Sequence, residues 1–214
     1  TAGVRKRKSL DGDLEYYSYH RSLRSIRRAA VWLLLMNATV RWGQVDNQLA
    51  NELLRHFKPT VIVVNKWDLV EKEKTQDEYV EYLDQALQGL NFAPIAFVSA
   101  AKSEGLRDVI AMAMNLSAQA AHRVSTSELN EVVQRIIAAK NPTSKLGKRP
   151  RIYYVTQLAV NPPTIGLFVN DADMFDPGYQ RFLMNRFREE LPFSEVPIKL
   201  IIRNRRKVTL DADG

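Results

Sequence analysis

The chain has 214 residues, 45% of them hydrophobic, so it can form one large domain or two small ones with a buried core, and wholesale disorder is excluded. It contains no cysteine and only three histidines, which excludes disulfides and thiolate metal sites and argues against a zinc site. The net charge of +7 and a sequence pI of about 9.6 favour a polyanionic partner, with nucleic acid as the first candidate.

The longest apolar run, Ala29–Met36, is too short to span a bilayer. Residues 5–8 are basic, but the apolar stretch of a signal peptide does not follow them. We therefore expect no membrane contact, and a location in the cytoplasm or an organelle matrix.

The first part of the chain alternates helical and strand patterns. After a basic loop at residues 1–12, the predicted elements are helix Glu15–Ala30, strand Val31–Met36, helix Val45–Phe57, strand Val61–Asn65, helix Thr75–Leu90, strand Pro94–Val98 and a helix that starts at Glu104. This alternation is typical of an α/β domain with a doubly wound parallel sheet.

The pattern changes at Ser125 to the order α-β-β-α-β. Ser125 and Glu128 match a capping box, which predicts the start of a helix. A basic loop follows, and then come strands Ile152–Ala159 and Thr164–Asn170, a helix around Tyr179–Phe187 and strand Pro197–Arg203. We place the boundary near residue 122, so residues 1–122 form the α/β domain and residues 123–214 an α+β domain.

The stretch Val61–Asp68 links a strand to a group of polar side chains. Its β-branched run predicts a strand buried on both faces, and ligands bind at the carboxyl ends of such strands. Asp68 can accept hydrogen bonds from the ring N–H and exocyclic amine of guanine, whereas adenine would oppose it with an acceptor. Asn65 can brace the loop or contact the base edge, and Lys66 can lay its stem over the base. A solvated loop remains the alternative for this motif alone.

Two further stretches favour a guanine nucleotide. Ser99–Lys102 follows the next strand, and its small residues would let the backbone N–H of Ala100 or Ala101 approach the guanine carbonyl oxygen; a simple helix cap is the alternative. Thr1–Gly3 resembles the end of the Asp-Thr-Ala-Gly motif that contacts magnesium and the γ-phosphate in GTPases. Val4 follows where signalling GTPases often carry a water-orienting glutamine, so an intact enzyme would need a cation or a partner residue instead.

In its full run the chain is similar to the C-terminal part of the Der/EngA family, tandem GTPases that assist assembly of the large ribosomal subunit. The resemblance lies in Thr1–Lys8, Val61–Val70, Ser125–Asn130, Ile152–Gln157, Pro162–Thr164 and Leu167–Asp171. It implies part of a P-loop GTPase domain followed by a KH-like domain. The GTP-binding residues that it implies are Thr1, Ala2, Gly3, Val4, Asn65, Lys66, Trp67, Asp68, Ser99, Ala100 and Ala101.

The same resemblance implies cofactors and partners. The cofactors are GTP or GDP and magnesium, with a monovalent cation such as potassium as a further candidate. The partners are the large ribosomal subunit and its rRNA, together with a first GTPase domain that docks on the KH-like domain of an otherwise monomeric protein.

The sequence also departs from the family pattern. It lacks the phosphate loop, the first switch and the whole first GTPase domain, and Asn37 stands where the family usually has aspartate. No Gly-x-x-Gly occurs after residue 123, which removes the device by which ordinary KH domains clamp a nucleic-acid backbone. We therefore expect a fragment of a GTP hydrolase that is inactive alone, with no identifiable catalytic residue and no metal ligand set.

A second hypothesis is a non-enzymatic module for RNA binding or protein docking. Its candidates for RNA contact are Lys148, Arg149, Arg151 and Arg203, supported by the basic tail Arg203–Lys207. Tyr153 and Tyr154 would offer stacking surfaces, although aromatic residues on strands more often belong to a core.

Overall fold

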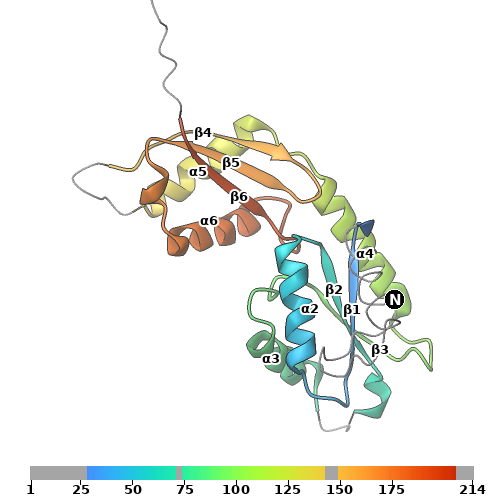
Figure 1. The fold of residues 1–214 in the computed structure, drawn as a ribbon. Helices are drawn as coiled ribbons and strands as arrows, with labels where there is room; N and C mark the ends of the chain where they lie inside the picture. Colours follow the sequence, from blue (N-terminus) through green and yellow to red (C-terminus); the bar gives the residue numbers. More distant parts are fainter. Residues whose placement is uncertain (1–27, 71–73, 143–148, 206–214) are drawn as a thin grey trace, which may run out of the picture. The chain divides into compact units, whose positions relative to one another are not determined.

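The computed structural model describes residues 28–70, 74–142 and 149–205 (Figure 1). It divides into two compact units, one running to Ala120 and including Glu195–Pro197, the other formed by Ala121–Ser194 and the residues from Ile198. The Thr1–Gly3 motif, Lys148 and nearly all of the helix predicted over Glu15–Ala30 lie outside the described residues.

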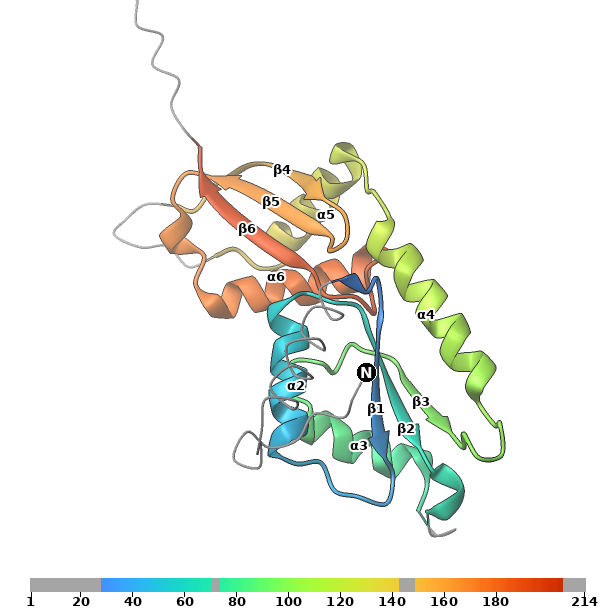
Figure 2. The same ribbon diagram turned by 45° about the vertical axis from the view of Figure 1, so that its right-hand side comes forward.

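The first unit contains a parallel sheet of order β1-β2-β3, which confirms the predicted fold class. Its strands are β1 (Trp32–Asn37), β2 (Thr60–Asn65) and β3 (Ile95–Val98). Its helices are α2 (Gln44–Arg55), α3 (Gln76–Ala86) and α4 (Leu106–Ala121). In Figures 1 and 2, α2 and α3 lie on one side of this sheet and α4 on the other, so both faces of β2 are covered.

The register of this sheet brings the strand ends together. Asn65 pairs with Asn37 on one side and with Val98 on the other. The predicted burial of β2 on both faces is confirmed, because its residues up to Val64 are all buried. The polar residues that follow β2 and β3 therefore start at one edge of the sheet.

Helix α3 ends earlier than predicted. It begins as expected, with a reciprocal capping box between Thr75 and Glu78, but its last residue is Ala86 and not Leu90. Leu87 and Leu90 are both buried in the core cluster, and Gly89 between them has a φ of +95°. The segment from Leu87 to Leu90, which the prediction included in the helix, is therefore a turn with buried leucines.

The second unit has the predicted order α-β-β-α-β. Its elements are α5 (Thr126–Ala139), β4 (Ile152–Ala159), β5 (Thr164–Val169), the 3₁₀ turn η3 (Ala172–Met174), α6 (Pro177–Glu190) and β6 (Lys199–Asn204). The sheet order is β4-β5-β6, with β4 antiparallel and β6 parallel to β5. Helices α5 and α6 lie on one face of the sheet, and the core of this unit is packed between them and that face.

The outer edge of β4 is occupied by side chains. The side-chain amide of Asn130 donates to the Val155 carbonyl and accepts from the Val155 N–H, both at 3.1 Å. Gln157 accepts from the Val124 N–H at 2.8 Å. The Asn130 bonds fix α5 against β4 and occupy edge groups that would otherwise be open to another strand, and the Gln157 bond ties β4 to the segment before α5.

The start of α5 agrees with the prediction only in part. Ser125 caps α5 by accepting from the Glu128 N–H at 3.2 Å, whereas the reciprocal bond of the predicted capping box is absent from this described helix start.

No helix within the described ranges is long and apolar enough to cross a membrane.

Candidate guanine site and basic sheet face

The residues after β2 turn sharply away from the sheet. Lys66 adopts a left-handed conformation, with φ 62° and ψ 35°, and starts the 3₁₀ turn η2 (Trp67–Leu69). A left-handed lysine costs about 1–2 kcal/mol, so neighbouring bonds must hold it in place. This turn places Asp68, which is half-buried, one residue into η2 at the carboxyl edge of the sheet.

Asn65 connects the two loops at this edge. Its Oδ1 accepts from the Lys66 N–H at 2.7 Å and from the Ala100 N–H at 3.1 Å. Of the two roles left open by the sequence, bracing the loop is therefore what the structure shows. Because Oδ1 serves two backbone donors, only the Nδ2 hydrogens remain for a base edge, and they suit the N7 and O6 acceptors of guanine.

The loop after β3 offers one particular backbone donor. The Ala100 N–H is already bonded to Asn65, and the Lys102 N–H donates to Ser99 Oγ at 3.3 Å. Among the described residues, nothing accepts a hydrogen bond from the exposed Ala101 N–H. Of the two amides predicted to meet the guanine carbonyl oxygen, Ala101 is thus the available one.

Gly105 sets the shape of that loop. It has a φ of +72°, and a Cβ on it would lie 2.6 Å from the carbonyl oxygen of Phe97. Its neighbour Glu104 pairs with Ser99 through two backbone hydrogen bonds. Only glycine fits this close approach, so the turn that presents Ala101 depends on Gly105.

The Trp67 ring packs η2 against β3 and α3. The ring contacts Phe97 at a centroid distance of 4.5 Å and Tyr79 at 5.5 Å, both edge-to-face. Burial, followed by the proximity of Tyr82, raises the pKa of Tyr79. The indole is thus engaged in packing, and it anchors the loop that carries Lys66 and Asp68.

Two further features lie beside the candidate guanine site. Asn37 Oδ1 accepts from both the N–H and the hydroxyl of Thr39, at 3.1 and 3.0 Å, and an aspartate could accept the same two bonds. A hollow of about 670 Å³ lies between the loop after β1 and the start of α3, lined by Thr39, Leu69 and Tyr79 among others. Neither Asn65, Asp68 nor Ala101 lines it, so it is separate from the candidate guanine site.

The remaining predicted nucleotide contacts cannot be placed. Thr1, Ala2, Gly3 and Val4 lie outside the described residues. Within the described part of the chain, no three His, Cys, Asp or Glu side chains are grouped so as to hold a metal ion.

The second unit collects basic residues at one end of its sheet. Asn170, directly after β5, donates through Nδ2 to the Arg149 carbonyl at 2.9 Å and accepts from the Arg151 N–H at 2.8 Å. Arg203 pairs in register with Phe168, two residues before Asn170. The structure therefore brings Arg149, Arg151 and Arg203 to the same end, while Lys148 lies outside the described residues.

The two tyrosines of β4 are on the surface. Tyr153 is 41% and Tyr154 42% exposed, so the alternative that places them in the core is wrong. The register shifts between Ile152 and Tyr154, and this irregularity leaves two successive tyrosines exposed. Arg205, assigned from the sequence only to the basic tail, lies over the Tyr153 ring at 5.1 Å from its centroid.

These features define a two-part protein: an α/β unit with a parallel sheet and an α+β unit with the α-β-β-α-β order of a KH-like domain. Residues 123–203 match the family described as the KH-domain-like of EngA bacterial GTPase enzymes, C-terminal. The chain is 40% identical to GTPase Der of Rhodopirellula baltica over 213 residues, which are 100% of this chain and 47% of that protein. It is 38% identical to GTPase Der of Trichormus variabilis and 40% identical to that of Lacticaseibacillus casei, each over 96% of this chain and 46% and 48% of the relative.

The chain belongs to the Der/EngA GTPase family and corresponds to its C-terminal portion, including the KH-like domain. It spans about half the length of the curated relatives that it matches.

Proposed function

We propose that this chain supplies the base-reading and RNA-facing portion of a GTPase that assists assembly of the large ribosomal subunit. The observation that carries the proposal is the hydrogen bond from the Ala100 N–H to Asn65 Oδ1, which ties the two guanine-motif loops together. Residues 1–122 would belong to the GTPase domain and residues 123–214 to the KH-like domain.

The base is read by donors and acceptors from both loops. The Asp68 carboxylate accepts from the ring N–H and the exocyclic amine of guanine, and the Ala101 N–H donates to the carbonyl oxygen. Adenine presents an acceptor to Asp68 and an amine to Ala101, so two repulsive contacts replace two of these three bonds, and the third is lost because adenine has no amine at the matching position. The Lys66 stem covers the base plane.

The phosphates and magnesium are handled by the other half of the GTPase domain, with Thr1–Gly3 approaching the γ-phosphate. Two features of β1 in the described structure support this division: it is an edge strand of the sheet, and Leu33 and Leu35, on one of its faces, are 46% and 63% exposed. The edge suits pairing with a further strand, and the exposed leucines suit cover by a further element. Hydrolysis is proposed for the intact protein, with a cation such as potassium or a partner residue replacing a glutamine at Val4, and not for this chain alone.

The proposed partners are the large ribosomal subunit, through rRNA contacts of Lys148, Arg149, Arg151 and Arg203, and a first GTPase domain that docks on the KH-like domain. Arg149, Arg151 and Arg203 support an RNA contact because they occur together at one end of the sheet. The intact protein is proposed to be a monomer in the cytoplasm.

The test is Asp68→Asn in the full-length protein. The GTP affinity should fall roughly 10- to 1,000-fold with the loss of two charge-assisted bonds, and xanthine nucleotides should bind better than they do to the wild type. Asp84→Asn, an exposed carboxylate on α3, is the matched control and should leave both affinities unchanged. Equal GTP binding by Asp68→Asn and wild type would show that Asp68 does not read the base.

A further inference from the structure

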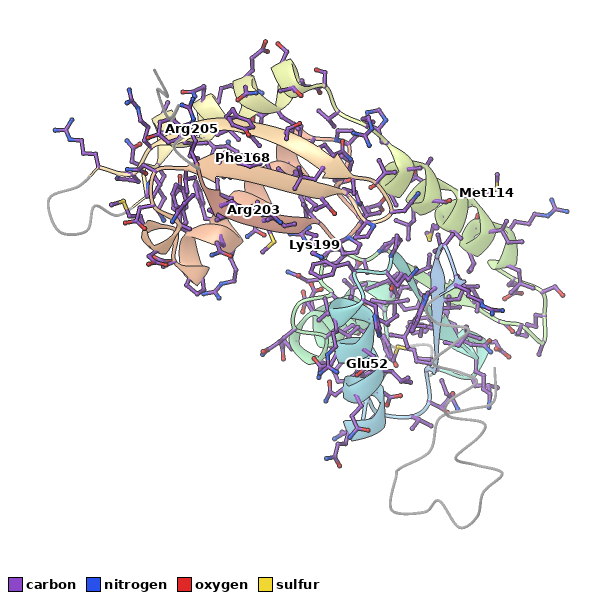
Figure 3. All side chains as sticks on the ribbon, turned by 45° about the horizontal axis from the view of Figure 1, so that its top comes forward. Glu52, Met114, Phe168, Lys199, Arg203 and Arg205 are labelled. Atoms are coloured by element: carbon purple, nitrogen blue, oxygen red, sulfur yellow. The ribbon has the colours of Figure 1, made fainter. Side chains whose placement is uncertain are left out.

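The sheet of the second unit has one face that no described helix covers. We call it the open face and define it by the side chains opposite α5 and α6. Strand register assigns to it Tyr154, Thr156, Leu158, Gly166, Phe168, Lys199, Ile201 and Arg203. Figure 3 looks onto this face, with Phe168, Lys199, Arg203 and Arg205 labelled.

Aromatic rings gather at one end of the open face. Tyr154 and Phe168 are register partners, and their rings stack with centroids 4.3 Å apart and planes 11° from parallel. One side of the Tyr154 ring is therefore occupied, yet 42% of the residue stays exposed. A flat group from outside can extend this stack on the free side of the ring.

Cations surround the rings. Arg203 stands beside Phe168 on β6, and Arg205 lies over the Tyr153 ring. None of the register positions that define the open face carries a carboxylate, and Lys199 adds a positive charge at the opposite end of β6, beside Thr164. Arg149 and Arg151 adjoin the same end through Asn170. This end combines π surfaces with positive charge, which is complementary to exposed bases on a phosphate backbone.

We propose that the Tyr154–Phe168 end of the open face binds single-stranded RNA, with a base stacked on Tyr154 and backbone phosphates held by Arg203 and Arg205. A duplex is a poor occupant because its bases are already stacked on one another. This surface lies on the sheet and does not need the Gly-x-x-Gly loop that the chain lacks. The inference rests on the proposed function only in taking rRNA as the source of the strand. Neither GTP nor GDP takes part in the binding.

The experiment measures fluorescence anisotropy of a labelled RNA of roughly 12 nucleotides with the whole 214-residue chain, without nucleotide, over a range of salt concentrations. Tyr154→Ala should weaken single-strand binding about tenfold, while Tyr154→Phe should keep it within about twofold, because stacking needs the ring and not the hydroxyl. Arg203→Gln should lower the slope of log affinity against log salt by about 0.7, the value for one lost phosphate contact on a single strand.

Leu158→Ala is the matched control. Leu158 is 42% exposed on the same strand and the same face, but it lies over Gly166 at the other end. Its removal should leave RNA affinity unchanged, and thermal melting of each variant checks the fold. RNA affinity equal to wild type in a folded Tyr154→Ala chain overturns the proposal and leaves the face to a protein partner. Equal affinity of the wild-type chain for the single strand and for a duplex of the same sequence also overturns the proposal. Neither result bears on guanine binding by Asp68.

Discussion

Replacing Asn65 separates its two roles at the guanine site. Asn65→Ala removes the acceptor of two backbone hydrogen bonds, to the Lys66 and Ala100 N–H groups. Each bond contributes about 0.5–1.5 kcal/mol, and both donors can turn to water, so we expect a loss of about 1–2 kcal/mol in unfolding free energy. Lys66 would also lose a contact that holds it in the left-handed conformation.

Asn65→Asp is the matched variant. A carboxylate keeps the Oδ1 acceptor but has no Nδ2 hydrogens to offer a base. The loops should therefore stay braced, with unfolding free energy within about 0.5 kcal/mol of wild type, while nucleotide affinity of the full-length protein falls. Asn65→Ala should lower both the unfolding free energy and the nucleotide affinity.

Amide hydrogen exchange measured by NMR tests the brace directly. Loss of a bond of about 1 kcal/mol should speed exchange of the Ala100 amide about fivefold in Asn65→Ala and leave it near wild type in Asn65→Asp. Unchanged exchange at Ala100 in the alanine variant would refute the idea that Asn65 joins the two loops. Unchanged nucleotide affinity in the aspartate variant would refute a base contact by Nδ2.

Two further variants probe stability. Gly105→Ala should destabilise the first unit by at least about 2 kcal/mol in urea unfolding, from its positive φ and the approach to Phe97, whereas Gly43→Ala should cost no more than about 1 kcal/mol because its Cβ has room. Burial raises the pKa of Tyr179 to about 12 from 10.0, so the folded state keeps a proton that the unfolded state loses first. The unfolding free energy should therefore fall as pH rises from 10 through 12, by about 1–3 kcal/mol, and Tyr179→Phe should remove that part of the fall; equal pH profiles would contradict it.

Local sequence patterns predicted the fold well where one residue type dominates a short segment. The β-branched run before Asn65 could only be a strand buried on both faces, and strand Ile152–Ala159 has the predicted bounds. The predicted end of α3 was wrong because Gly89, which can close a helix, here belongs to a turn that follows the helix, with Leu87 and Leu90 buried. A glycine in the sequence shows where the chain turns but not the residue at which the helix ends.

The fine structure of the sites depends on contacts between distant residues. The choice of Ala101 over Ala100 as the free donor follows from a bond between Ala100 and Asn65, 35 positions apart. The exposure of both Tyr153 and Tyr154 follows from a register shift against β5, which strict alternation along β4 cannot produce. Both facts need the paired strands to be in place before they can be derived.

Asparagine side chains position both candidate sites from within their own units. Asn65 joins the loops after β2 and β3, and Asn170 joins the segment before β4 to the end of β5. Asn65 does so with Oδ1 alone, which accepts from two backbone N–H groups, whereas Asn170 uses both ends of its amide, for one backbone donor and one backbone acceptor. Since each set of bonds closes inside one unit, Asn65→Ala should leave RNA binding by Tyr154 unchanged, and Tyr154→Ala should leave Ala100 exchange unchanged.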